Sequence, residues 1–138
     1  MKQILLIFGI TVLLLSACKK KDDNDTTKLV SPPAWIQGKW MDISQPAYAR
    51  IGGFEFTSDN IIDYDQDENV NINFKDNFQL LVDSSQVTIE ETKTNISYEV
   101  KITTNGMVTS VYNFEKGTDN TTIVYKLSSS IDVILTKQ

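Results

Sequence analysis

The chain has 138 residues, a formal net charge of −5, no histidine and a single cysteine. The acidic balance argues against nucleic-acid binding, because neutralising phosphates takes clustered Lys and Arg side chains. Without histidine the chain lacks the commonest general base and a usual zinc ligand, so we expect neither catalysis nor a cofactor.

The first 17 residues have the layout of a secretory signal. Lys2 forms a short basic region, an apolar run extends from Ile4 to Leu15, and the small residues Ser16 and Ala17 follow. The run is too short to span the hydrocarbon core of a bilayer, which takes about 20 residues. The sequence therefore predicts a cleaved signal at residues 1–17 and a mature chain without a transmembrane helix.

The string that ends this segment, Leu15-Ser16-Ala17-Cys18, resembles the lipobox of bacterial lipoproteins. The resemblance implies cleavage before Cys18, a diacylglycerol on its thiol and acylation of the new amino group. Several acyl chains, at about 0.8 kcal/mol per buried CH₂, would make this anchor durable. We expect lipid attachment to the outer membrane, on its surface or periplasmic face. The alternative is an ordinary secretory signal with a chance cysteine.

Residues 18–33 are predicted to form a flexible tether. The string KKKDDNDTTKLVSPP has almost nothing apolar to bury, so burial cannot offset the entropy of ordering it. Lys21-Asp22-Asp23 resembles the short signal that sends lipoproteins of Bacteroidetes-type bacteria to the cell surface; a charged spacer without an address is the alternative. Pro32 and Pro33 are expected to stiffen its end.

Residues 34–138 are enough for one modest domain and too few for two. Short apolar–polar alternations broken by turn residues predict an all-β fold of about eight to ten antiparallel strands, in a sandwich or an up-and-down barrel. Asn105-Gly106 is a strong hairpin signal, because both residues tolerate positive φ. Residues expected to share one face of a strand are Phe54 and Phe56, Ile62 and Tyr64, Val70, Ile72 and Phe74, Val87 and Ile89, Ile96, Tyr98, Val100 and Ile102, and Ile123, Tyr125 and Leu127.

One interval fits two structures. Val70, Phe74, Phe78 and Leu81 recur at helical spacing, so residues 74–82 would also fit a short helix. The opening Val-Asn-Ile-Asn-Phe favours a strand, since Asn and β-branched residues are poor helix formers. We expect a strand here, with the helix as the alternative.

A Gly-x-Trp, Gly38-Lys39-Trp40, stands in the first expected strand. It resembles the motif of the lipocalin and lipocalin-like families, and most closely the small lipocalin-like domains of Bacteroidetes lipoproteins. The resemblance implies an up-and-down barrel at residues 34–138 whose base is plugged by Trp40, with Gly38 allowing close backbone approach. The chain has no second family motif such as Thr-Asp-Tyr, which counts against a deep ligand-binding calyx.

The densest polar cluster is the string DYDQDEN, which begins at Asp63. An EF-hand loop starting there would need glycine at its sixth position and glutamate at its twelfth, where Glu68 and Phe74 stand. A calcium site of another kind would need these carboxylates to converge. We expect instead a solvated strand end and loop, whose charges discourage edge-to-edge pairing, and no metal.

Four aromatic residues inside such a barrel would line an apolar pocket with polar tips: Phe56, Tyr64, Tyr98 and Tyr125. An eight-stranded barrel can hold one small ligand or be filled by its own side chains, and these large residues favour filling. The leading hypothesis is a monomeric, non-catalytic, membrane-anchored protein that binds a small apolar or amphipathic ligand. The rival is a filled barrel whose outer surface meets an envelope protein or polysaccharide. An inhibitor role is a third option.

Overall fold

The computed structural model of the protein describes residues 28–44 and 46–138. The predicted signal, the lipid attachment at Cys18 and the first part of the predicted tether lie outside these residues. Within the described ranges, no helix is long and apolar enough to cross a membrane.

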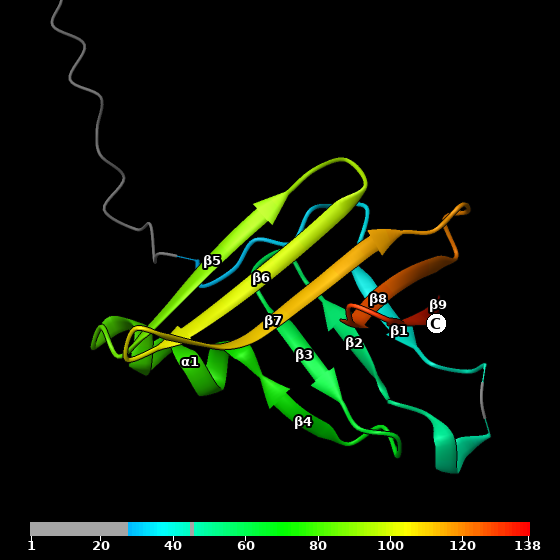
Figure 1. Cartoon of the computed structure of the whole chain (residues 1–138), viewed down its shortest axis with the longest axis horizontal. Coiled ribbons are helices and arrows are strands. Elements are labelled where there is room, and N and C mark those ends of the chain that lie inside the picture. Colours follow the sequence, from blue (N-terminus) through cyan, green and yellow to red (C-terminus); the bar gives the residue numbers. More distant parts are fainter. Residues whose placement is uncertain (1–27, 45) are drawn as a thin grey trace, which may run out of the picture.

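Nine antiparallel strands form one curled sheet that makes up most of the described chain (Figure 1). Its order, β4-β3-β2-β1-β9-β8-β7-β6-β5, confirms the predicted all-β, up-and-down arrangement, and β1 pairs with β9 to join its two halves. The strands are β1 Gly38–Met41, β2 Gly53–Phe56, β3 Ile61–Tyr64, β4 Val70–Asn73, β5 Val87–Lys93, β6 Ser97–Thr104, β7 Met107–Lys116, β8 Thr122–Ser128 and β9 Ile131–Lys137.

Helix α1, Phe74–Asp83, lies at the opening between the two edge strands β4 and β5 and contacts β3, β4 and β5. Asn73 caps its first turn by accepting a hydrogen bond from the backbone N–H of Asp76 at 3.3 Å. The predicted strand is therefore right up to Asn73, and the helical alternative is right from Phe74 onward. Asn is a poor residue inside a helix but a favoured one at its N-cap, which places the boundary. A short 3₁₀ helix, Ala47–Ala49, lies between β1 and β2.

Aromatic side chains fill much of the interior. Phe54 and Phe56 each pack edge-to-face against Phe114, with ring centroids 5.0 Å apart. Phe114 also stacks on Tyr125 at 5.1 Å. Each such pair stabilises the fold by about 0.5–1.5 kcal/mol beyond the burial of its surface.

The folded unit begins earlier than predicted. Leu29 packs against the core and Val30 is fully buried. Ser31 donates its backbone N–H and its hydroxyl to the carboxylate of Glu91 on β5, at 2.9 and 3.2 Å. The prediction that the flexible tether runs to residue 33 is therefore wrong at its end. The composition of this segment suggested that nothing would offset the loss of conformational entropy on ordering it. Burial of Leu29 and Val30, together with the Ser31 hydrogen bonds, offsets that loss.

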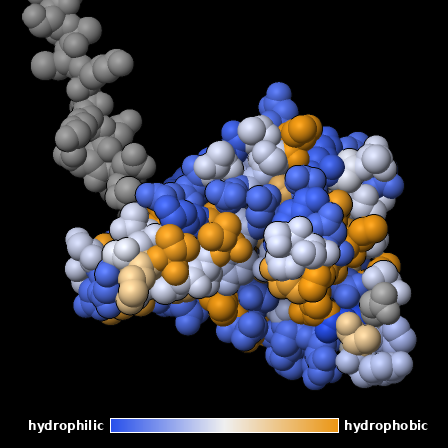
Figure 2. All heavy atoms as spheres, viewed as in Figure 1, coloured by the Kyte–Doolittle hydropathy of each residue, from blue (hydrophilic) through white to orange (hydrophobic). Residues whose placement is uncertain are grey.

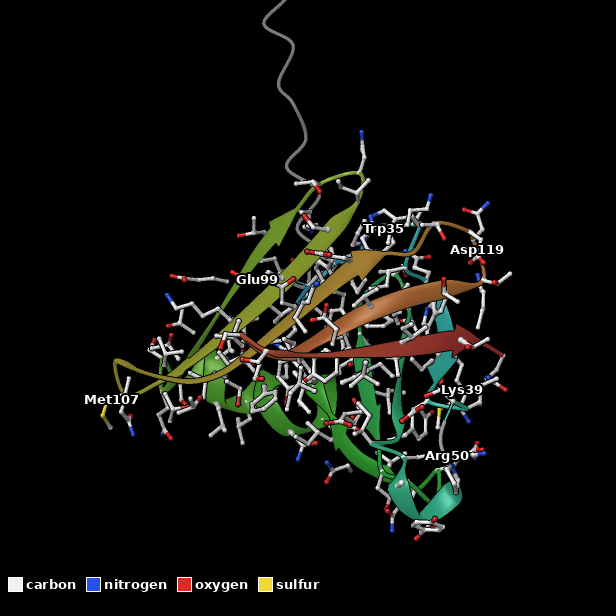
Figure 3. The ribbon with its side chains drawn as sticks, turned by 45° about the vertical axis from the view of Figure 1, so that its right-hand side comes forward. Trp35, Lys39, Arg50, Glu99, Met107 and Asp119 are labelled. Atoms are coloured by element: carbon white, nitrogen blue, oxygen red, sulfur yellow. The ribbon has the colours of Figure 1, made fainter. Side chains whose placement is uncertain are left out.

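Trp40 and Gly38 lie on β1, just after the chain enters the sheet at the end that we call the entry end. The Trp40 indole is buried and donates to the Ile36 carbonyl oxygen at 2.6 Å. Gly38 has a φ of +126°, a conformation that favours glycine. Trp35 and Asp119 mark the entry end in Figure 3, and Arg50 lies at the opposite end, which we call the mouth.

Candidate functional site

A cavity of about 430 Å³ opens at the mouth. The pairing of β7 with β8 is short: it begins at the pair Phe114 and Tyr125 and ends at the pair Lys116 and Ile123. The rest of β7 therefore separates from β8 toward the mouth. A register shift at Asp63 also interrupts the pairing of β3 with β4. The residues that line the cavity are Arg50, Ile51, Phe54, Asp63, Tyr64, Asp65, Gln66, Asp67, Asn71, Tyr125 and Leu127.

Asp63 is the carboxylate that faces the interior at this cavity. Phe54 is its partner on β2, and Phe56 is the partner of Ile61. Residues paired directly across two strands lie on the same face of the sheet. Asp63 therefore shares the inner face with the buried residues Phe54, Phe56 and Ile61. The expectation of a solvated strand end and loop places Asp63 correctly near the end of β3 but is wrong about its surroundings, because its side chain is partly buried on the inner face.

The surroundings of Asp63 disfavour its charge. Burial raises the pKa of its carboxyl group to about 6, against a smaller opposing effect of the hydrogen bond with Asn71. The neighbouring charge of Asp65 adds to the rise. The pKa of Tyr112 is raised to about 12, mainly by burial and to a smaller extent by the negative charge of Asp63. The same two causes raise the pKa of Tyr125. Both phenols stay protonated at neutral pH.

The remaining acidic residues of DYDQDEN shape the turn between β3 and β4. The Asp65 carboxylate accepts the backbone N–H groups of Asp67 and Asn69 at 2.9 and 2.8 Å. Glu68 has a φ of +60° and pairs with Lys39 at 2.8 Å. Among the residues that the structure describes, no three acidic side chains converge to hold a metal ion.

The four predicted pocket residues do not come together. Tyr125 lines the cavity, whereas Phe56 and Tyr98 are buried in the filled part of the core. The backbone of Tyr64 is at the cavity border, but its ring lies on the outer face. Its hydroxyl donates to Glu55 at 2.7 Å, and the Lys39 ammonium lies 4.7 Å from the ring centroid. The inward placement of Tyr64 is therefore wrong.

Asp63 is absent from the sequence-based prediction because Ile62 and Tyr64 make the opposite face of β3 the more apolar one. The signal that finds it is the length of the loop before β3. Residues 57–60 form a four-residue hairpin loop, closed by the Thr57 N–H on the Asn60 carbonyl oxygen at 3.0 Å. Such a loop pairs Phe56 with Ile61, and alternation then turns Asp63 inward.

Arg50, the single arginine of the chain, lies in the segment between β1 and β2 and lines the cavity at the mouth (Figure 3). Its charge makes a small contribution to lowering the pKa of Glu68, after the hydrogen bond from Lys39. Leu127 is half-exposed at the same rim, and Phe54 is buried beneath, with its ring centroid 4.9 Å from that of Tyr125. The cavity thus joins an aromatic wall to a polar rim.

No family model, curated protein or solved structure matches the chain. The cavity is therefore the feature that bears on what the domain binds. Its carboxylate, amide and phenol groups suit hydrogen bonding to a polar head group, and its aromatic and leucine side chains suit an apolar body.

Proposed function

We propose that this chain is a non-catalytic, membrane-anchored lipoprotein whose lipocalin-like barrel binds a small amphipathic molecule at its mouth. The observation that carries the proposal is the cavity of about 430 Å³ bordered by Phe54, Asp63 and Tyr125. Small-molecule sites are typically concave, of roughly 300–1,000 Å³, with apolar walls and a few placed polar groups. This cavity has that size, and its lining combines apolar and aromatic side chains with a larger share of polar groups.

The packing directs the ligand to the mouth rather than to the centre of the barrel. Phe56, Tyr98 and Phe114 are buried against one another and occupy the space that a deep calyx would need. Wholly apolar ligands fit less well, because they would remove water from Asp63 and Asn71 without replacing its hydrogen bonds.

The two ends of the barrel suit different tasks in this proposal. Residues 29–36 join the sheet at the entry end, and Arg50 and the cavity lie at the opposite end (Figure 3). A lipid on Cys18 would therefore hold the domain by the end remote from the cavity. The mouth would stay open to ligands in the surrounding aqueous phase.

Blocking the cavity tests the proposal. Leu127 is half-exposed on the cavity wall, so Leu127→Trp should fill the mouth without disturbing the buried core. Ile134 is 55 % exposed on the outer face of β9, where its partner is Val124, and Ile134→Trp is the matched control. The probe is 2-phenylethanol, followed by NMR of the purified protein. We expect saturable shifts at Tyr125 in the wild type and the control, lost in Leu127→Trp. Equal binding by both variants would contradict the proposal.

The rival, a filled barrel that binds an envelope partner through its outer face, has less support. On the face seen in Figure 2, apolar side chains lie in several separate groups among hydrophilic ones. On the outer face of β8 and β9, the exposed Ile134 lies beside the ion pairs of Lys126 with Glu115 and Asp132. A binding patch would be more continuous.

A further inference from the structure

The cavity also indicates a class of ligand, an inference that rests on the proposed function. We infer that the mouth binds a small organic cation, with an ammonium head group against the Asp63 carboxylate and an apolar body over Phe54 and Tyr125. Two observations support the inference. The inward-facing carboxylates Asp63 and Glu91 differ in whether a cation of the described residues neutralises them, and the aromatic residues Phe54 and Tyr125 lie beside Asp63 at the cavity.

Glu91 is the inward-facing carboxylate near the entry end, where its partner on β6 is the buried Val100. It accepts hydrogen bonds from the Tyr98 hydroxyl at 2.6 Å and the Ser31 N–H at 2.9 Å, and Lys93 lies 3.2 Å away. Burial alone would raise its pKa, but these partners together lower it. A cation of the chain itself therefore neutralises Glu91.

Asp63 has no such neutralisation within the part of the chain that the structure describes. Burial, the Asn71 amide and the like charge of Asp65 set its pKa, and no cation of that part contributes. The ionisable groups that face it from β7 and β8 are the phenols of Tyr112 and Tyr125, which are neutral at pH 7. Bringing a positive head group into the cavity would supply the partner that Lys93 supplies to Glu91.

Arg50 does not reverse the charge of the cavity. The lining includes this one arginine against Asp63, Asp65 and Asp67. Asp65 already accepts backbone N–H groups within its turn, so Asp63 remains as the carboxylate that faces the barrel interior. An anionic ligand would have to approach this excess of negative charge.

The aromatic wall favours a cation for a second reason. The rings of Phe54 and Tyr125 pack together at 4.9 Å, and both residues border the cavity. Aromatic faces attract ammonium groups that lie within about 6 Å of the ring centroid. The same rings offer a surface for the apolar body, so the two parts of an amphipathic amine have partners in one cavity.

Three probes of one shape test the inference: 2-phenylethylammonium, the uncharged 2-phenylethanol and the anion 3-phenylpropionate. At pH 7.5 we expect the cation to bind at least about 10-fold more tightly than the alcohol, because hydrogen bonds between charged groups are the stronger ones. The anion should bind most weakly. Asp63→Asn should bring the cation within about 2-fold of the alcohol, because the charge–charge attraction is removed. Glu91→Gln, which alters an inward carboxylate that Lys93 already neutralises, should leave the ratio unchanged.

The wild-type protein provides a test that needs no variant. Since Asp63 must be ionised to attract the cation, the ratio of cation to alcohol affinity should fall as the pH is lowered from 7.5 to 5. A ratio near one at pH 7.5, a ratio independent of pH, or tighter binding of the anion would overturn the cation inference while leaving the proposed cavity intact. If none of the three probes binds saturably, the proposed function itself is overturned.

Discussion

Asp63 occupies a position where the neighbouring inward-facing residues, Phe54 and Ile61, are apolar. A carboxylate there is costly because burial removes part of its hydration. Groups with strongly perturbed pKa values are concentrated at functional sites, where lost stability is accepted for chemistry or recognition. Asp63 fits that description because it also borders the cavity.

Asp63→Asn should stabilise the protein at neutral pH. The folded state holds the carboxyl proton more tightly than the unfolded state, with a pKa of about 6 against an ordinary 3.8. Fully converted, this shift would amount to about 3 kcal/mol. Solvent screening at a half-buried site reduces the expected gain to about 1–2 kcal/mol in the free energy of unfolding at pH 7, measured by urea denaturation.

The sign of the pH dependence follows from the same shift. Between about pH 4 and pH 6 the folded state binds more protons than the unfolded state, so the contribution of Asp63 to stability falls as the pH rises. The destabilisation is complete above pH 6 and absent below pH 4. The gain from Asp63→Asn should follow this curve. A gain that is the same at pH 3.5 and pH 7 would show that ionisation of Asp63 is not its cause.

At the scale of elements, helix α1 takes the place of a hydrogen-bonded seam between β4 and β5. Phe74, its first residue, is fully buried, with ring centroids 5.3 Å from both Phe78 and Tyr112. Through Tyr112 the helix contacts β7, on the opposite side of the interior from β4. The helix therefore packs into the open side of the barrel instead of lying as a loose connection.

Phe74→Ala should destabilise the fold by about 3–5 kcal/mol, because it removes a buried aromatic side chain and leaves a cavity. Leu80→Ala on the same helix is the control: its side chain is 77 % exposed, so we expect a change within about 0.5 kcal/mol. Urea denaturation followed by tryptophan fluorescence measures both. Similar values for the two variants would mean that α1 is not packed against the sheet through Phe74.

On the scale of the whole molecule, residues 29–31 link the predicted tether to the sheet. Val30 is buried, and Ser31 accepts a hydrogen bond from Lys93 through its carbonyl oxygen at 2.9 Å, besides its bonds to Glu91. The domain is therefore held firmly at the point where the predicted anchor segment meets it.

Cys18→Ala tests the predicted anchor. The lipobox resemblance implies acylation of this thiol, so the variant should lose incorporation of labelled palmitate and move from the membrane fraction to the soluble fraction. Ser16→Ala keeps the cysteine and the small residues before it, and should remain lipidated. A Cys18→Ala protein that stays with the membrane would contradict the predicted anchor.

The sequence by itself determined the all-β class and the hairpin at Asn105-Gly106, where φ is +50° and +79°, and it left the up-and-down order as one of two arrangements. These depend on local alternation and on residues that tolerate a turn. Only the tertiary structure decided which face of β3 points inward. A strand's two faces exchange with a one-residue change of register, and the loop at residues 57–60 sets that register against β2. The same pairing turned Tyr64 outward and placed Asp63 at the cavity, because side-chain direction there depends on the neighbouring strand.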